Sequence, residues 1–335
     1  MEHRKLTRYL ISLVMILIMV GLAEWTNEKE ILFPEMTALI IGLLIIDKRV
    51  WNVKRWQIIL LMTLGAAVGI CIVRYSPLPY VVNLCAAFAF AGASLLISRA
   101  TLIPLISACV LPVLLHTESI VYPIAVFSMS VSVVLVQIIL EKCGIRNRMP
   151  KTVGRKPGKE DIIRWLILFC FVGALAELAV GMDYPYIILP PLMVTFVEMV
   201  NSKAGFRNRP TQVFLFLTTA ATLGTVLQIV GHHHLHLPES IVALTITAIL
   251  FLIFEWTGKY FAPAGALAFI PMLLPKENLG WLPLEASIGA ALFITIAMVV
   301  FQKCYKWNRA QLIFCATPTL LREYMNRKKR KKQIE

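Results

Sequence analysis

Residues 101–118 read TLIPLISACVLPVLLHTE, and residues 260–277 read YFAPAGALAFIPMLLPKE. At a shift of 159 residues the prolines and the final glutamates of the two stretches coincide: Pro104 with Pro263, Pro112 with Pro271, and Glu118 with Glu277. The same shift aligns Thr63, Leu64 and Gly65 with Thr222, Leu223 and Gly224, and Tyr122 with Trp281. Because the matches involve proline, glycine and glutamate, a general excess of apolar residues does not explain them, and we infer an internal duplication.

The duplicated stretches belong to a chain that is apolar almost throughout. Of its 335 residues, 58% are hydrophobic and 16% charged, and the mean hydropathy is +0.74. A soluble domain does not reach that apolar share, whereas apolar runs of roughly 15 to 21 residues suit helices that cross a bilayer core of about 30 Å. We predict an all-α integral membrane protein with about twelve transmembrane segments: 8–24, 31–46, 56–74, 80–97, 101–115, 120–140, 162–181, 186–200, 211–230, 239–256, 260–275 and 284–304.

The positive charge follows the loops. The formal net charge is +14, and the basic residues gather between alternate apolar runs and in the last residues of the chain. The positive-inside rule therefore predicts a multi-pass protein of the cell membrane with both termini in the cytoplasm, and gives no reason to expect a nucleic-acid partner. The basic run 327–332 is interpreted as a topology anchor, with binding of anionic lipid headgroups as the alternative.

A stretch rich in glycine, proline and basic residues divides the chain near its middle. We expect four parts: a first six-span unit at 1–141, a basic cytoplasmic linker at 142–161, a second six-span unit at 162–305 and a basic cytoplasmic tail at 306–335. Near the start of each unit the shift changes by a few residues, which aligns Pro34 with Pro190 and Glu24 with Glu177. Six spans per unit give both units one orientation, as in transporters built from parallel repeats.

Each unit contains two short spans that open near a proline: Pro34 and Pro104 in the first, and Pro190 and Pro263 in the second. Proline suits the first turn of a helix. A short helix that begins inside the membrane directs its free N–H groups and positive dipole end into the protein, where an anion can bind. Paired, proline-interrupted segments therefore predict a transport site between the units. The alternative is that these helices only tilt and pack.

The second unit carries a small-residue run around its last short span. Thr257 and Gly258 precede it by a few residues, and the run itself is Pro263, Ala264, Gly265 and Ala266. Small residues allow a ligand or another helix to approach the backbone. The stretch resembles the signature of the HPP family of integral membrane proteins, in which Thr-Gly-Thr is followed by His-Pro-Pro and Ala-Gly-Ala. In this chain Phe261 and Ala262 replace the histidine and first proline of that signature. The resemblance implies a permeation path for a small anion such as nitrite.

Ionisable residues near the spans provide a second set of candidates. Glu24 and Glu177 occupy equivalent positions in the two units, which favours either a proton-linked step or a shared structural contact. Glu198, Glu255 and Lys259 lie towards the cytoplasmic ends of their spans, where anchoring at the interface is the alternative to function.

Two further patterns have structural interpretations. The cluster of His232, His233, His234 and His236 lies between Gly231 and Pro238, so we expect a solvated outer loop, with metal binding or pH sensing as the alternative. The spacing of Gly65 and Gly69 predicts helix packing within the chain, with a homodimer face as the alternative. Seven scattered cysteines without a C-x-x-C pair predict no metal site and no disulfide framework.

These observations favour a permease or channel for a small solute, preferably an inorganic anion, in contact with the lipid bilayer. The chain has no Walker loop, no G-x-S-x-G and no dinucleotide fingerprint, so we expect no cofactor, no catalytic residues and no enzyme. A membrane assembly or scaffold protein is the main alternative, and an interface packed shut by apolar side chains would favour it. An enzyme that acts on lipid would require at least two acidic residues or histidines at one cavity.

Overall fold

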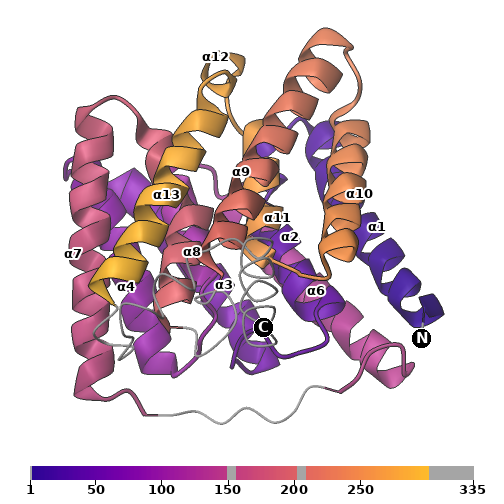
Figure 1. Cartoon of the computed structure of the whole chain (residues 1–335), viewed down its shortest axis with the longest axis horizontal. Helices are drawn as coiled ribbons and strands as arrows, with labels where there is room; N and C mark the ends of the chain where they lie inside the picture. The colour runs from indigo at the N-terminus through magenta and orange to yellow at the C-terminus, as the bar shows by residue number, and fades with distance from the viewer. Residues whose placement is uncertain (1, 149–155, 202–208, 302–335) are drawn as a thin grey trace, which may run out of the picture.

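A computed structural model describes residues 2–148, 156–201 and 209–301. The basic tail 306–335 and the central part of the linker lie outside the described residues. Within them, every regular element is helical (Figure 1). This confirms the all-α class predicted from the apolar runs.

Eight helices are long and apolar enough to cross a membrane, as expected of a multi-pass membrane protein. Their ends agree with the predicted spans to within a few residues, apart from the first helix, which begins earlier in the basic segment. They are α1 (Glu2–Thr26), α3 (Arg55–Tyr75), α4 (Tyr80–Ser98), α6 (Val121–Lys142), α7 (Lys159–Gly181), α9 (Pro210–Leu227) with its π-helical extension η5 (Gln228–His234), α10 (Glu239–Thr257) and α13 (Leu282–Val300).

The four predicted short segments also form helices. They are α2 (Pro34–Ile40) with the π-helical η2 (Ile41–Ile45), α5 (Leu105–Leu115), α8 (Pro190–Asn201) and α11 (Ala262–Phe269) with η6 (Ile270–Met272). Almost every residue in them is buried, in contrast to the long helices, each of which keeps one exposed apolar side. The short helices therefore form the interior of the molecule and the long helices surround them. Three shorter elements complete the described chain: η1 (Lys29–Ile31), η3 (Pro185–Ile188) and α12 (Lys276–Leu279).

Helices from the two halves of the chain pack against each other in pairs. At the periphery α1 contacts α10 and α4 contacts α7, while in the interior α2 contacts α11 and α5 contacts α8. Figure 1 shows α1 beside α10 at one side of the molecule and α7 at the other. The interior of the molecule is thus an interface between the first and second halves.

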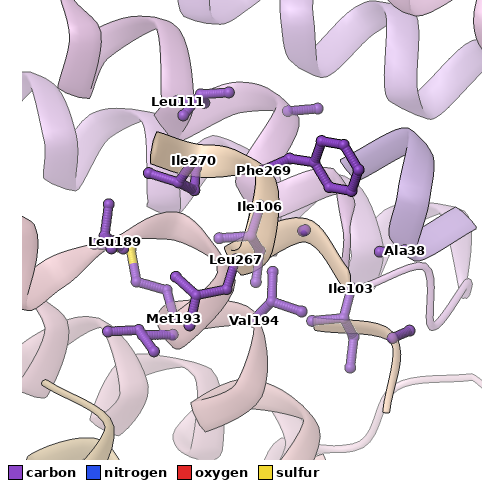
Figure 2. Packing of buried hydrophobic residues seen from close by; sticks show 14 of the residues in the cluster. Ala38, Ile103, Ile106, Leu111, Leu189, Met193, Val194, Leu267, Phe269 and Ile270 are labelled. Carbon is purple, nitrogen blue, oxygen red and sulfur yellow. The ribbon is translucent and has the colours of Figure 1, made fainter. Parts of the chain in front are cut away.

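Apolar side chains fill most of that interface. Figure 2 shows Ile103 and Ile106 from the first half close to Val194 and Leu267 from the second. These four side chains are at most 6% exposed. Because lipid is as apolar as these residues, close van der Waals packing is the main force that holds such helices together.

Glycines allow the long helices to approach the short ones. A Cβ built on Gly69 of α3 would lie 2.5 Å from the carbonyl oxygen of Cys109 in α5, and one on Gly224 of α9 would lie 2.1 Å from that of Ala268 in α11. Gly65 also faces α5, through Leu105. The G-x-x-x-G pair therefore packs helices within the chain, as predicted, and is not a surface available to a second copy.

The histidine cluster differs from the prediction. His232, His233 and His234 do not lie in a loop but form the π-helical end of α9, which extends that helix beyond Gly231. The Nδ1 atoms of His232 and His234 lie 3.0 and 2.9 Å from the carbonyl oxygens of Leu237 and Ile229. The described residues contain no group of three or more histidine, cysteine or acidic side chains able to hold a metal ion.

Candidate functional site

A small cavity lies where the four short helices meet. Its volume is about 10 Å³, which is room for about one water molecule. All four helices contribute to its wall, and so does Trp51 from the segment that follows η2. The lining residues are Glu35, Ala38, Trp51, Pro104, Ser107, Val194, Glu198, Ala262, Pro263 and Ala266. We call this space the central cavity.

Glu35 is the first of two carboxyl groups at the central cavity. It lies in the first turn of α2 directly after Pro34, and it is 1% exposed. One carboxyl oxygen accepts a hydrogen bond from the Ser107 hydroxyl of α5, and the other, Oε2, has no hydrogen-bond partner. The free N–H groups at the start of α2 favour a negative charge at this place.

Glu198 is the second carboxyl group and comes from α8. It is 5% exposed, and its Oε1 accepts a hydrogen bond of 3.2 Å from the indole Nε1 of Trp51, while its Oε2 has no partner. The Trp51 ring lies so close to Gly42 of η2 that a Cβ on this glycine would be 2.4 Å from it. Gly42 thus makes the space that allows Trp51 to reach Glu198.

Neither carboxyl group has an ion pair with any described residue. Burying a lone carboxylate in an apolar interior costs several kcal/mol or more, so each group must bind a proton or a cation at least part of the time. Ionisable side chains at this depth of a membrane protein are functional candidates for that reason. Two buried carboxyl groups without an ion pair therefore line one space, the central cavity.

Several predicted site residues meet at the central cavity. Pro104, Pro263 and Ala266 line it. Gly265 lies beside it on α11 and packs against Thr37 and Ile41, where an added Cβ would be 2.4 Å from Ile41 Cδ1. The remaining short-helix residues that were predicted, Pro34, Pro190 and Ala264, are buried but do not line the cavity. From α8 the wall is formed by Val194 and Glu198 instead of the first turn.

Three predicted residues lie elsewhere. Thr257 is the last residue of α10, and its hydroxyl donates to the Ile253 carbonyl of the same helix. Glu24 accepts hydrogen bonds from the backbone N–H groups of Glu239 and Ser240, and so caps the start of α10. Glu177 is exposed on α7. The two glutamates share a place in the alignment but not a set of contacts.

Two larger cavities lie on either side of the central one. The first, about 200 Å³, is near the end of α4 and the start of α7, and its polar lining includes Arg99, Thr101 and Arg164. The second, about 370 Å³, is near the end of α5, and its lining includes Lys29, His116 and Asn278. We call them the linker-end cavity and the far-end cavity.

Helix α5 connects the three cavities. Ile103, two residues before the helix, lines the linker-end cavity. Pro104 and Ser107 line the central cavity, and Leu111 and Leu114 line the far-end cavity. The spacings of three, four and three residues from Pro104 to Leu114 keep these positions on one helix face. Residues on one face of this buried helix and directly before it therefore line all three cavities.

Glu35 is the functional candidate that the sequence did not single out. Its signal was present, because an acidic residue directly follows the proline that opens a short apolar helix. No family model, no curated protein and no solved structure matches this chain. The HPP resemblance therefore remains a prediction based on residues 257–266.

Proposed function

We propose that the protein is a membrane permease that moves a small solute, preferably an inorganic anion such as nitrite, through the central cavity. The observation that carries this proposal is the row of three cavities along one face of α5. The outer two are large enough to admit a small hydrated ion, whereas the middle one has room for about one water molecule. Such an arrangement corresponds to a transporter with its path occluded, in which the apolar contacts between the halves must separate for passage.

The pairing of residues around the central cavity supports a duplicated architecture of two parallel six-helix units. Pro104 and Pro263, like Ser107 and Ala266, are 159 positions apart, and Ala38 and Val194 are 156 apart. Members of each pair line the same cavity. In duplicated transporters the site lies at the interface of the repeats, and the four short helices would then complete twelve membrane segments.

The charge of the outer cavities is compatible with an anion. The linker-end cavity has two arginines, Arg99 and Arg164, and one aspartate, Asp161. Positive groups in a recessed space attract anions and raise their local concentration. By the positive-inside rule we place this cavity on the cytoplasmic side of the cell membrane, with both termini on that side.

Flux measurements test the proposal directly. Purified protein is reconstituted into liposomes, and uptake of nitrite, nitrate and chloride is compared with uptake by protein-free liposomes. Nitrate is included because it is the anion of a strong acid and does not cross lipid as a neutral molecule. We expect uptake of at least one anion above the protein-free level; no uptake of any of them would remove the basis for the proposal.

A variant that blocks the path separates permeation from other roles. Ala266→Phe places a bulky ring at the wall of the central cavity, and we expect it to abolish uptake. Gly181→Ala, at a position with no atom within 4 Å of the new Cβ, is the matched control and should transport normally.

The two alternatives are less well supported by the geometry. A scaffold protein is favoured by the apolar packing between the halves but does not explain two buried carboxyl groups without ionic partners. A lipid-acting enzyme requires two acidic residues at one cavity, and Glu35 and Glu198 satisfy that condition. However, a space of about 10 Å³ does not admit a lipid beside them.

A further inference from the structure

We propose that Glu35 and Glu198 form a proton-binding pair at the central cavity and that proton binding there is coupled to passage of the solute. The pair comes from different halves of the chain, one carboxyl from α2 and the other from α8. Coupling to a solute rests on the proposed function, whereas proton binding itself does not.

The contacts of Glu35 and Glu198 leave one free oxygen on each carboxyl group, which can bind a proton but does not provide a metal site. Each carboxyl group has one oxygen in a hydrogen bond, to Ser107 or Trp51, and one buried oxygen without a partner. A proton on the free oxygen gives it an O–H group, which can donate to a single water in the cavity. A metal cation would require about six oxygen ligands, and the cavity wall offers two carboxylates and one hydroxyl.

Few other ionisable groups near the central cavity could bind this proton in place of Glu35 and Glu198. Helix α11, which packs on both α2 and α8, has no ionisable side chain. The ionisable groups on the other described helices that pack against α2 or α8 have other partners or lie at the surface. On α1, Lys5 and Tyr9 bond to Glu255, Arg8 pairs with Asp47, and Glu24 caps α10. On the other helices, Tyr122 of α6 donates to the Ala108 carbonyl, Glu141 of α6 pairs with Arg55, Cys109 of α5 faces Gly69, and Glu285 of α13 accepts from the Tyr186 N–H. His3, Arg4 and Lys142 are exposed.

A proton explains how an anion passes two carboxyl groups. Two carboxylates at the narrowest part of the path repel an anion, whereas two carboxylic acids do not. One proton held by the pair throughout leaves it with a single negative charge. A hydronium ion from the aqueous cavity gives a second proton to the remaining carboxylate and becomes water, and the neutral pair then admits the anion. Proton and anion leave together on the other side, so the protein would act as a proton–anion symporter.

The first test requires no solute. Infrared difference spectra of the full-length protein in lipid are recorded as pH is changed, and the carbonyl stretch of protonated carboxylic acids is followed. We expect a band from buried carboxylic acids that decreases in both Glu35→Gln and Glu198→Gln. Glu118→Gln, at an exposed glutamate, should leave it unchanged. The glutamine variants keep the size of the side chain and remove a buried charge, so they should fold, and size-exclusion profiles check this. A band that is unchanged in either variant overturns the proposal.

The second test measures coupling in liposomes with a trapped pH indicator. For the wild type we expect uptake of the transported anion to acidify the lumen and to rise up to about tenfold for each unit that the external pH falls, because one proton enters with each anion. Both glutamine variants should lose the acidification and this pH dependence, and Glu118→Gln should keep them. Wild-type pH dependence in either variant, or dependence on Na⁺ in place of pH, overturns the proposal.

The two proposals fail in distinguishable ways. Absence of uptake for every anion contradicts the permease function, while an infrared band that requires both glutamates still supports the proton-binding pair. Conversely, anion uptake without any contribution of Glu35 and Glu198 to the band or to pH dependence supports the permease and overturns the pair.

Discussion

The two halves of the chain contribute to the central cavity in similar and in different ways. Pro104 and Ala38 from the first half have counterparts in Pro263 and Val194 from the second, and all four line the cavity. The carboxyl groups do not follow this pairing. Glu35 is the second residue of α2, where α8 has Pro191, and Glu198 is the ninth residue of α8, where the α2–η2 segment has Gly42.

The residues that determine the shape of the cavity are therefore different from the residues that determine its chemical character. The apolar pairs are explained by the packing of two similar units and carry no information about a ligand. The carboxyl groups require specific partners that exist only once, Ser107 for Glu35 and Trp51 for Glu198. The two halves therefore differ in the polar groups that they contribute to the cavity.

The largest effect is expected where the long and short helices touch. Gly224→Ala would place a Cβ 2.1 Å from the Ala268 carbonyl oxygen, and Gly69→Ala one 2.5 Å from that of Cys109. Since backbone must move in both, we expect losses of stability of about 1–3 kcal/mol, with the greater loss for Gly224→Ala. Thermal unfolding in detergent measures this, with Gly181→Ala as the control. Equal stability of all three proteins would mean that the long helices do not approach the short helices this closely.

The second prediction concerns Trp51, which joins the halves by its bond to Glu198. Trp51→Phe keeps an aromatic ring beside Gly42 but removes the indole N–H, leaving Glu198 without its hydrogen bond. We expect a loss of about 1–3 kcal/mol from the unsatisfied buried group and the smaller ring.

The double variant Trp51→Phe, Glu198→Leu isolates that contact, because leucine, unlike glutamine, cannot accept the indole hydrogen bond. If the bond is real, the second substitution should cost less in the presence of the first than alone, because the two residues interact directly. Additive losses in thermal unfolding would contradict the contact.

The third prediction compares the two aligned glutamates outside the cavity. Glu24 caps the start of α10 with two backbone hydrogen bonds and one from the Ser240 hydroxyl, whereas Glu177 is exposed. Glu24→Ala should therefore lower stability by about 0.5–2 kcal/mol, the range for the loss of a helix N-terminal cap. Glu177→Ala should change it very little. A proton-linked role for both glutamates predicts instead that both variants alter the pH dependence of uptake.

Much of the fold follows from sequence patterns that act locally. Apolar run length and the opening prolines predicted where the helices of the described chain form, for example 80–97 against Tyr80–Ser98 for α4. The polar contacts of the cavity did not follow, because they join residues far apart in the chain: 72 positions separate Glu35 from Ser107, and 147 separate Trp51 from Glu198. Hydropathy assigns a residue to a helix, but only the packing of the helices determines which side chains meet.

The smallest effect is expected at the one pair of cavity positions that differs by a single oxygen atom, Ser107 and Ala266. Ser107→Ala makes the first half like the second and removes the hydroxyl that donates to Glu35. We expect a loss of about 0.5–1.5 kcal/mol for this hydrogen bond and a change in the pH dependence of uptake, since the charged form of Glu35 loses its donor. Ala266→Ser adds a hydroxyl on α11 instead of α5 and should not restore either property to the Ser107→Ala variant. If the double variant did regain both, the two halves would be interchangeable around the carboxyl groups, and the specialisation inferred from Glu35 and Glu198 would be wrong.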